Sequence, residues 1–262
     1  MTRPILYTCS LVLVAAAAFG QAPSPAPQGP APTGRAATTP EDVAARARAQ
    51  QDRLLNDWAN LARYRDQNAE LAPLAPGEAR VVFYGDSITD GWGRVQGTFF
   101  PGKPYVNRGI SGQTTPQMLV RFRQDVVALK PKVVVILAGT NDIAGNTGPS
   151  TPEMIQDNFK SMVDIAKAND IGVVLASILP ASDYPWRPGL DPGPKIVALN
   201  TWLKQYAASR DLVYLDYYSA VVDGKLGMKP ELASDGVHPT RAGYDIMTPL
   251  AERAVADALR QP

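Results

Sequence analysis

Two residue types that often carry chemistry are nearly absent from this chain of 262 residues, which has one cysteine, Cys9, and one histidine, His238. Disulfide frameworks, cysteine-ligated zinc sites and multi-histidine metal sites all need more of these residues than the sequence provides. We therefore expect no metal site and no required cofactor. Any reaction that depends on an imidazole must use His238.

An excess of charge of one sign is also missing. The chain has 26 Lys and Arg residues against 25 Asp and Glu residues, for a net charge of +1. Proteins that bind nucleic acids through a basic surface usually show a much larger imbalance, so we expect no nucleic-acid partner. The 45% of hydrophobic and 19% of charged residues are typical of a globular protein.

Long hydrophobic runs are scarce as well. The apolar run from Leu11 to Gly20 is too short to span a bilayer, and small residues at Ala18 and Gly20 precede Gln21 as they would at a cleavage site. Residues 1–20 therefore read as a secretory signal peptide cleaved near Gln21, with a membrane anchor as the alternative. We expect a secreted or periplasmic protein with no transmembrane segment in its mature chain.

The next two segments are expected to differ in structure. Residues 21–39 are rich in Pro and Ala and predict an extended linker. Thr39 can cap a helix that has Pro40 in its first turn, and we expect this helix to cover residues 40–72. Apolar residues recur in it at helical spacing, namely Leu54, Leu55, Trp58, Leu61 and Ala62. This face is expected to pack on the domain that follows, and binding of a partner is the alternative.

Residues 73–262 alternate short apolar runs with longer helical patterns, as one α/β domain does. Strands are expected at residues 81–84, 105–107, 133–138, 172–178 and 213–216. Helices are expected at residues 116–129, 152–168, 195–208 and 241–259. The alternation predicts a parallel sheet of about five strands with helices on both faces.

Residues suited to nucleophilic catalysis follow these strands. Ser87 comes just after the first strand, and a serine hydroxyl needs an adjacent base to act as a nucleophile near neutral pH. His238 can be that base, and Asp235, three residues earlier, can hold the imidazole in the required tautomer. Asp216, at the end of the last strand, is the alternative carboxylate. Because ligands bind outside the carboxyl ends of parallel strands, we expect these groups to meet at one edge of the sheet.

Four short motifs in order resemble the four blocks of the SGNH hydrolases, also called GDSL esterases and lipases. They are Gly85-Asp86-Ser87, Gly109, Gly139-Thr140-Asn141-Asp142 and Asp235-Gly236-Val237-His238. The surrounding residues look most like the branch with platelet-activating-factor acetylhydrolase-like and bacterial acyl-esterase members. The resemblance implies a flavodoxin-like three-layer α/β/α sandwich and a Ser87/His238/Asp235 triad. It also implies an oxyanion hole formed by the N–H groups of Ser87 and Gly109 and the side chain of Asn141. Asp86 and Asp142 are expected to be structural.

The resemblance points to a secreted serine esterase for short-chain acyl esters, such as acetyl groups on a carbohydrate. Lysophospholipase, arylesterase and thioesterase activities are alternatives in the same family, and a non-catalytic glycan-binding module is an alternative outside it. Trp92, Tyr184 and Trp186 follow the first and fourth strands and are candidate substrate contacts. The same aromatic side chains could instead cover the core.

Overall fold

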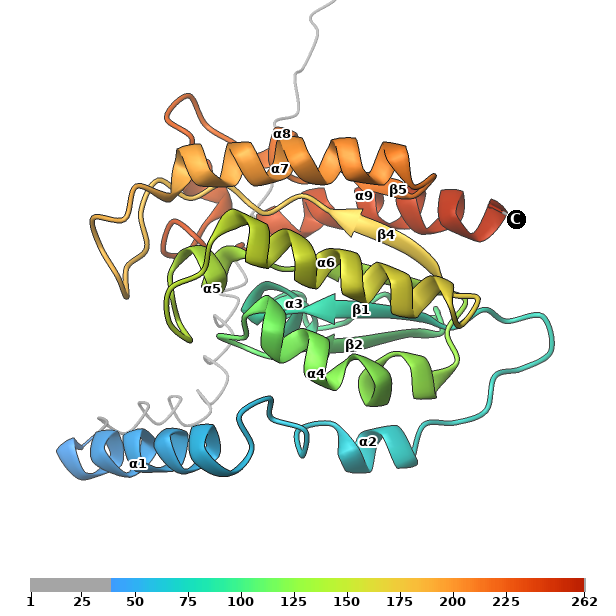
Figure 1. Cartoon of the computed structure of the whole chain (residues 1–262), viewed down its shortest axis with the longest axis horizontal. Coiled ribbons are helices and arrows are strands. Elements are labelled where there is room, and N and C mark those ends of the chain that lie inside the picture. The colour runs from blue at the N-terminus through green and yellow to red at the C-terminus, as the bar shows by residue number, and fades with distance from the viewer. Residues whose placement is uncertain (1–38, 262) are drawn as a thin grey trace, which may run out of the picture. The chain divides into compact units, whose positions relative to one another are not determined.

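The computed structural model describes residues 39–261 of the chain (Figure 1). The predicted signal peptide and all but the last residue of the predicted linker lie outside the described residues. The chain divides into a unit of residues 1–45 and a unit of residues 46–262, and helix α1 (Pro40–Asn56) crosses that division. The predicted cap is present, since the Asp42 N–H donates to the Thr39 hydroxyl over 3.1 Å. None of the described helices combines the length and apolar character needed to cross a membrane.

The larger unit is built on a five-stranded sheet. Its strands are β1 (Val81–Gly85), β2 (Tyr105–Gly109), β3 (Val133–Leu137), β4 (Gly172–Ala176) and β5 (Val213–Leu215). All pairings are parallel, and the spatial order is β2-β1-β3-β4-β5. This is the flavodoxin-like order, in which the chain changes its direction of winding between β1 and β3. The predicted three-layer sandwich with a parallel sheet is therefore confirmed.

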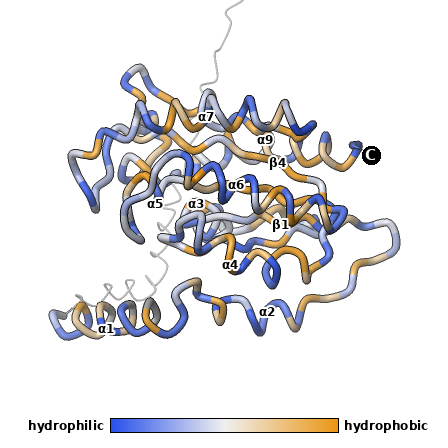
Figure 2. The backbone as a smooth tube through the Cα atoms, viewed as in Figure 1, coloured by the Kyte–Doolittle hydropathy of each residue, from blue (hydrophilic) through white to orange (hydrophobic). Residues whose placement is uncertain are grey.

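Helices cover both faces of the sheet because the strands are apolar on both sides. The three central strands β1, β3 and β4 are buried almost throughout, and Figure 2 shows β1 and β4 mostly in the hydrophobic colour. One core cluster joins the sheet to α4 (Thr115–Asp125), α6 (Pro152–Lys167) and α7 (Pro192–Ser209). The other joins it to α3 (Ser87–Gln96), α8 (Tyr218–Val221) and α9 (Arg241–Arg260). Among the shorter helices of this unit are α5 (Thr140–Ile143), η1 (Val127–Leu129) and η2 (Pro230–Leu232).

The expected single helix over residues 40–72 is wrong in its second half. Helix α1 ends at Asn56, turns follow, and a short helix α2 (Arg65–Ala69) comes next. The Asp57 carboxylate accepts hydrogen bonds from the N–H groups of Leu61 and Ala62, over 2.7 and 2.9 Å. Aspartate competes in this way with the helical backbone and favours caps and turns. The residues after Asn56 that we assigned to one helical face therefore lie in turns.

Candidate active site

Ser87 lies at the turn between β1 and α3. Strand β1 ends at Gly85, and Asp86 caps the helix by accepting a hydrogen bond from the Ile88 N–H over 3.0 Å. A β-carbon on Gly85 would lie 2.8 Å from the backbone carbonyl oxygen of Leu137, which cannot rotate away, so this position requires glycine. The N–H of Ser87 is the first of the helix, where it has no acceptor within the helix and adds to the positive end of the helix dipole.

His238 and Asp235 share a tight loop before α9. The Asp235 Oδ1 accepts from the N–H groups of Val237 and His238, over 3.0 and 2.8 Å. Its Oδ2 lies 2.8 Å from the Nδ1 of His238. Partial burial raises the pKa of Asp235, but the hydrogen bonds from His238 and Val237 outweigh it and hold that pKa below its usual value. Asp235 is therefore ionised near neutral pH and can accept a hydrogen bond from the Nδ1–H of the imidazole.

The other ring nitrogen of His238 faces the serine. Its Nε2 lies 2.9 Å from the Oγ of Ser87, although 151 residues separate the two in the sequence. The structure thus brings Ser87, His238 and Asp235 together in the predicted order. The alternative carboxylate, Asp216, is engaged elsewhere, because its oxygens accept from the N–H and hydroxyl of Ser219 over 3.0 and 2.7 Å.

The two other residues expected in the oxyanion hole lie at the same edge of the sheet. Gly109 ends β2 opposite Gly85 of β1, and Asn141 lies in α5, just after β3. The Gly109 N–H donates to the Oδ1 of Asn107 over 2.9 Å. The Asn141 Nδ2 donates to the carbonyl of Gln113 over 3.0 Å, so in this structure both groups already have protein acceptors. A developing oxyanion would have to share or replace these acceptors.

The sequence model of the GDSL-like lipase/acylhydrolase family matches residues 83–246, a range that contains all the residues of this site. The chain belongs to this family. A Bacteroides fragilis protein of known crystal structure is 48% identical, with a TM-score of 0.76 over 78% of this chain and 100% of its own. A GDSL-like lipase of Bacteroides thetaiotaomicron is 46% identical, with a TM-score of 0.74 over 77% of this chain and 100% of its own.

A more distant relative carries a more specific name. The acetylxylan esterase of Geobacillus stearothermophilus is 28% identical in an alignment of length 202 that covers 64% of this chain and 90% of that protein. These similarities confirm the family resemblance. The finer placement in the branch with platelet-activating-factor acetylhydrolase-like members stays a prediction.

Two buried carboxyl groups support the loops of this GDSL-family site. Burial raises the pKa of Asp86 to about 6, and it raises the pKa of Asp142 to about 6 as well. Asp142 accepts from the N–H of Thr115 at 3.0 Å and from its hydroxyl at 2.6 Å, which fastens α5 to the start of α4. The cap that Asp86 provides for α3 and the contacts of Asp142 with Thr115 fit the structural roles that we expected for these two residues.

Trp186 is the exposed aromatic residue beside His238. Its side chain is 41% exposed, and the centroids of the two rings are 6.0 Å apart. The indole N–H donates to the Oδ1 of Asn146 over 3.2 Å, and the ring stacks on that of Tyr184 at 5.0 Å. Tyr184 itself is fully buried. We therefore assign Tyr184 as the support of Trp186 rather than as a surface that a substrate touches.

The expectation that Trp92 contacts substrate does not fit the structure. Its side chain is 1% exposed and packs within an aromatic cluster on the α3 and α9 side of the sheet. The neighbouring rings in that cluster belong to Phe83, Phe99, Phe100, Tyr217 and Tyr244. Its indole N–H donates to the side chain of Gln96. Trp92 is thus a core residue, in agreement with the alternative reading of these aromatics.

Sequence reasoning gave no role to several polar residues that hold the site in place. Asn107 accepts from Gly109, and Gln113 accepts from Asn141 through its carbonyl. Asn146 donates to the Oδ1 of Asn141 over 2.7 Å, which fixes the orientation of that amide. Asn107 and Gln113 lie two residues before and four residues after Gly109, the second motif. Their nearness to Gly109 in the sequence was the signal that could have indicated a role in the site.

Proposed function

We propose that this protein is a serine esterase in which Ser87 is the nucleophile, His238 the general base and acid, and Asp235 the group that orients His238. The observation that carries the proposal is the continuous hydrogen-bonded chain from Ser87 Oγ to His238 Nε2, at 2.9 Å, and from His238 Nδ1 to Asp235, at 2.8 Å. Membership in the GDSL-like lipase/acylhydrolase family supports the same chemistry.

The reaction proceeds in two halves. Ser87 Oγ attacks the ester carbonyl carbon while its proton passes to the Nε2 of His238 and the carbonyl electron pair moves onto oxygen. The tetrahedral intermediate then expels the alcohol, which takes the proton from His238, and the acyl group stays on Ser87. Water next loses a proton to His238, attacks the acyl carbon and releases the acid, and the proton returns to Ser87.

Asp235 makes His238 competent for both halves. By accepting a hydrogen bond from Nδ1–H, Asp235 favours the tautomer that has no proton on Nε2, so Nε2 can take the proton of Ser87. The lowered pKa of Asp235 supports this role, since the carboxylate stays negative and stabilises the imidazolium that forms.

The developing oxyanion is stabilised by the N–H groups of Ser87 and Gly109 and by the Nδ2 of Asn141. Loss of one such donor typically slows a reaction about 100- to 1000-fold. Gly109 and Asn141 reach this state by sharing or giving up the hydrogen bonds that they make to Asn107 and Gln113 in the resting site.

The substrate we propose is a short-chain acyl ester, of the acetyl type, carried on a carbohydrate. The exposed indole of Trp186 beside His238 offers an apolar surface for a sugar ring. The similarity to the Geobacillus acetylxylan esterase supports the same substrate class. We also propose that the protein is secreted or periplasmic after removal of residues 1–20. A mature chain that begins far from Gln21 in N-terminal sequencing would contradict this part.

The Ser87→Ala variant tests the reaction. We expect it to lose hydrolysis of p-nitrophenyl acetate by at least about 1000-fold and to lose labelling by a fluorophosphonate probe. Ser161→Ala is the matched control, because this half-buried serine lies on α6, away from the site, and donates to the carbonyl of Asp157. Full activity or labelling of Ser87→Ala would overturn the proposal. An unlabelled wild-type protein that binds glycans would favour the non-catalytic module.

A substrate panel tests the acyl and alcohol parts. Rates on p-nitrophenyl esters of increasing chain length are compared with acetate release from acetylated xylan. We expect the acetyl ester to be preferred and xylan to be deacetylated. Preference for acyl chains of eight or more carbons, or for lysophospholipid or thioester substrates, would overturn the substrate class and leave the serine mechanism intact.

A further inference from the structure

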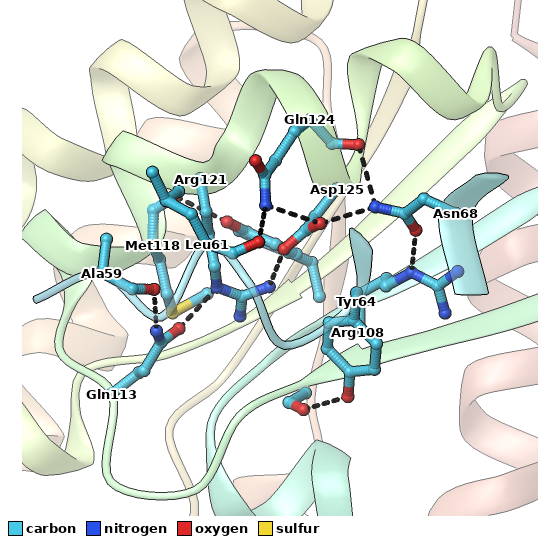
Figure 3. Close-up of polar contacts among 12 residues, drawn as sticks. Ala59, Leu61, Tyr64, Asn68, Arg108, Gln113, Met118, Arg121, Gln124 and Asp125 are labelled. Atoms are coloured by element: carbon cyan, nitrogen blue, oxygen red, sulfur yellow. Dashed lines mark hydrogen bonds and ion pairs between the residues drawn. The ribbon is translucent and has the colours of Figure 1, made fainter. Parts of the chain in front are cut away.

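The segment from Asp57 to Ala69 precedes the matched family region, yet its backbone is held by side chains next to the site. Three glutamine side chains donate to its carbonyl groups, each over 2.7 Å: Gln113 to Ala59, Gln117 to Trp58 and Gln124 to Leu61. Two of these bonds are drawn in Figure 3. Specific hydrogen bonds of this kind fix the path of the segment along α4, which a merely apolar contact would not do.

A fully buried ion pair lies beneath these contacts. The Nη1 of Arg121 is 3.0 Å from the Oδ2 of Asp125, and both side chains have no exposed surface. The Nη2 of Arg121 donates to the carbonyl of Gly85 over 3.1 Å, at the turn that presents Ser87. Its Nε donates to the side-chain oxygen of Gln113, and the backbone carbonyl of Gln113 accepts from the side chain of Asn141. One guanidinium is therefore tied to two loops of the site.

The second oxygen of Asp125 leads back to the N-terminal segment and on to Gly109. Asn68 donates to the Oδ1 of Asp125 over 2.8 Å and accepts from the Nε of Arg108 over 2.8 Å. The guanidinium of Arg108 lies 4.7 Å above the ring of Tyr64. The hydroxyl of Tyr64 donates to the carbonyl of Gly109. Figure 3 shows this bond together with the hydrogen bonds that join Asn68 to Asp125 and Arg108.

These contacts hold the residues on both sides of the Gly109 N–H, one through a side chain and one through the backbone. Asn68 fixes the side chain of Arg108, which precedes that N–H, and Tyr64 fixes the carbonyl that follows it. Displacing a reacting geometry by about 1 Å can cost about 100-fold in rate. We propose that Tyr64 and Asn68 are positioning residues for the oxyanion hole, and that the segment Asp57–Ala69 is part of the catalytic scaffold. This inference rests on the proposed esterase function.

The variant Tyr64→Phe removes one oxygen and keeps the ring under Arg108. We expect kcat for p-nitrophenyl acetate to fall about 5- to 50-fold, which is less than the effect of losing a donor outright. KM should change less than about twofold, because the substrate ground state carries little charge on its carbonyl oxygen. The inhibition constant of a boronic acid, which forms a tetrahedral adduct on Ser87, should rise by the same factor as kcat falls.

The variant Tyr84→Phe is the matched control. Tyr84 is also buried, lies against an arginine and donates to a backbone carbonyl, that of Met118, but this carbonyl lies within α4. We expect Tyr84→Phe to lower the unfolding temperature without changing kcat or the inhibition constant. A Tyr64→Phe enzyme that is merely less stable, with kcat and the inhibition constant of the wild type, would overturn the inference.

Asn68→Ala gives a second, independent variant, for which the same fall in kcat and rise in the inhibition constant are expected. If it does not fold, Tyr64→Phe still decides the matter. Failure of the esterase proposal looks different: the wild-type protein itself would then show no hydrolysis and no fluorophosphonate label. If the wild type is active and Tyr64→Phe has the same kcat and inhibition constant, only the positioning role of Tyr64 is contradicted.

Discussion

A β-carbon placed on Gly109 would lie 2.1 Å from the backbone nitrogen of Asp90. The end of β2 and the first turn of α3 thus approach each other more closely than any side chain allows. The backbone of Gly109 does not have a positive φ. Glycine is therefore needed here for the close approach of the two segments rather than for a turn. The same approach brings the second motif against the helix that begins at Ser87.

We expect the Gly109→Ala variant to lose both stability and activity. The obstructing atoms belong to the backbone and cannot rotate away, so α3 or β2 must shift at a cost of about 1–3 kcal/mol or more. Because the shift displaces the N–H proposed for the oxyanion hole, kcat should fall by about 100-fold. Urea unfolding and steady-state kinetics measure the two effects.

Gly224→Ala is the control for this variant, because a β-carbon there would meet nothing within 4 Å. It should leave the unfolding free energy and kcat close to those of the wild type. A Gly109→Ala enzyme with wild-type kcat would exclude this residue from the oxyanion hole.

The variant Asp235→Asn tests the orienting carboxylate. Asparagine can still accept the two loop N–H groups through its oxygen, but its amide nitrogen then faces Nδ1 of His238 and favours the tautomer with a proton on Nε2. That tautomer cannot accept the proton of Ser87, and kcat should fall by about four orders of magnitude.

Asp216→Asn is the matched change at the alternative carboxylate, whose partner is Ser219. We expect it to keep wild-type kcat. If Asp216→Asn were inactive and Asp235→Asn active, the roles of the two carboxylates would be reversed.

Asp142 should make the folded protein less stable as pH rises. Its pKa is raised by burial to about 6 in the fold, from an ordinary value of 3.8. Between about pH 4 and pH 6 the folded state therefore keeps a proton that the unfolded state loses. The stabilisation of the fold by protonated Asp142 is present in full below about pH 4 and is lost as pH rises through about 6. A shift of this size corresponds to about 1–3 kcal/mol.

We therefore expect Asp142→Asn to flatten the fall in unfolding free energy between pH 4 and pH 6, relative to the wild type. Asp86, whose pKa is also raised to about 6, supplies a similar slope that remains in the variant. Urea midpoints measured across pH 4–7 give the comparison, with the exposed Glu70→Gln as control. An identical pH profile for Asp142→Asn and the wild type would show that Asp142 ionises normally.

Trp186 should affect the alcohol side of the substrate. Its indole is exposed beside His238, so Trp186→Ala removes apolar surface while leaving the hydrogen bonds among Ser87, His238 and Asp235 in place. We expect kcat/KM for acetylated xylan to fall about 10-fold, corresponding to about 1.4 kcal/mol of lost burial. The rate on p-nitrophenyl acetate should stay within about twofold. Equal losses on both substrates would remove Trp186 from carbohydrate recognition.

The sequence predicted the strands well because all of them except β2 are short apolar runs closed by a polar or glycine-containing turn. The same pattern placed Ser87 and Asn141 at the carboxyl edge, since parallel strands fix where their following residues lie. His238 follows no strand directly, and it was assigned because it is the single histidine and lies in the fourth motif. Helix α3 was not predicted. Its pattern is interrupted by Gly91 and Gly93, and its start is recognisable mainly from the capping Asp86.

The N-terminal segment could not be predicted because its structure depends on partners remote in sequence. Helical spacing joined Leu55 and Leu61 on one face, whereas Asp57 ends the helix between them. The bond from Tyr64 to Gly109 spans 45 residues, and no local pattern reports it. Polar pairs such as this one become visible only when the fold sets the register of both segments.

The single imidazole of the chain gives the protein an intrinsic spectroscopic reporter. The proton between the Nδ1 of His238 and the Oδ2 of Asp235 lies in a 2.8 Å hydrogen bond, and no second histidine can contribute a ring signal. Histidine labelled with nitrogen-15 would therefore produce one pair of ring resonances, which belong to His238 without any assignment to a residue. Tautomer, protonation and adduct formation at the active site can then be followed directly by magnetic resonance in the unmodified enzyme.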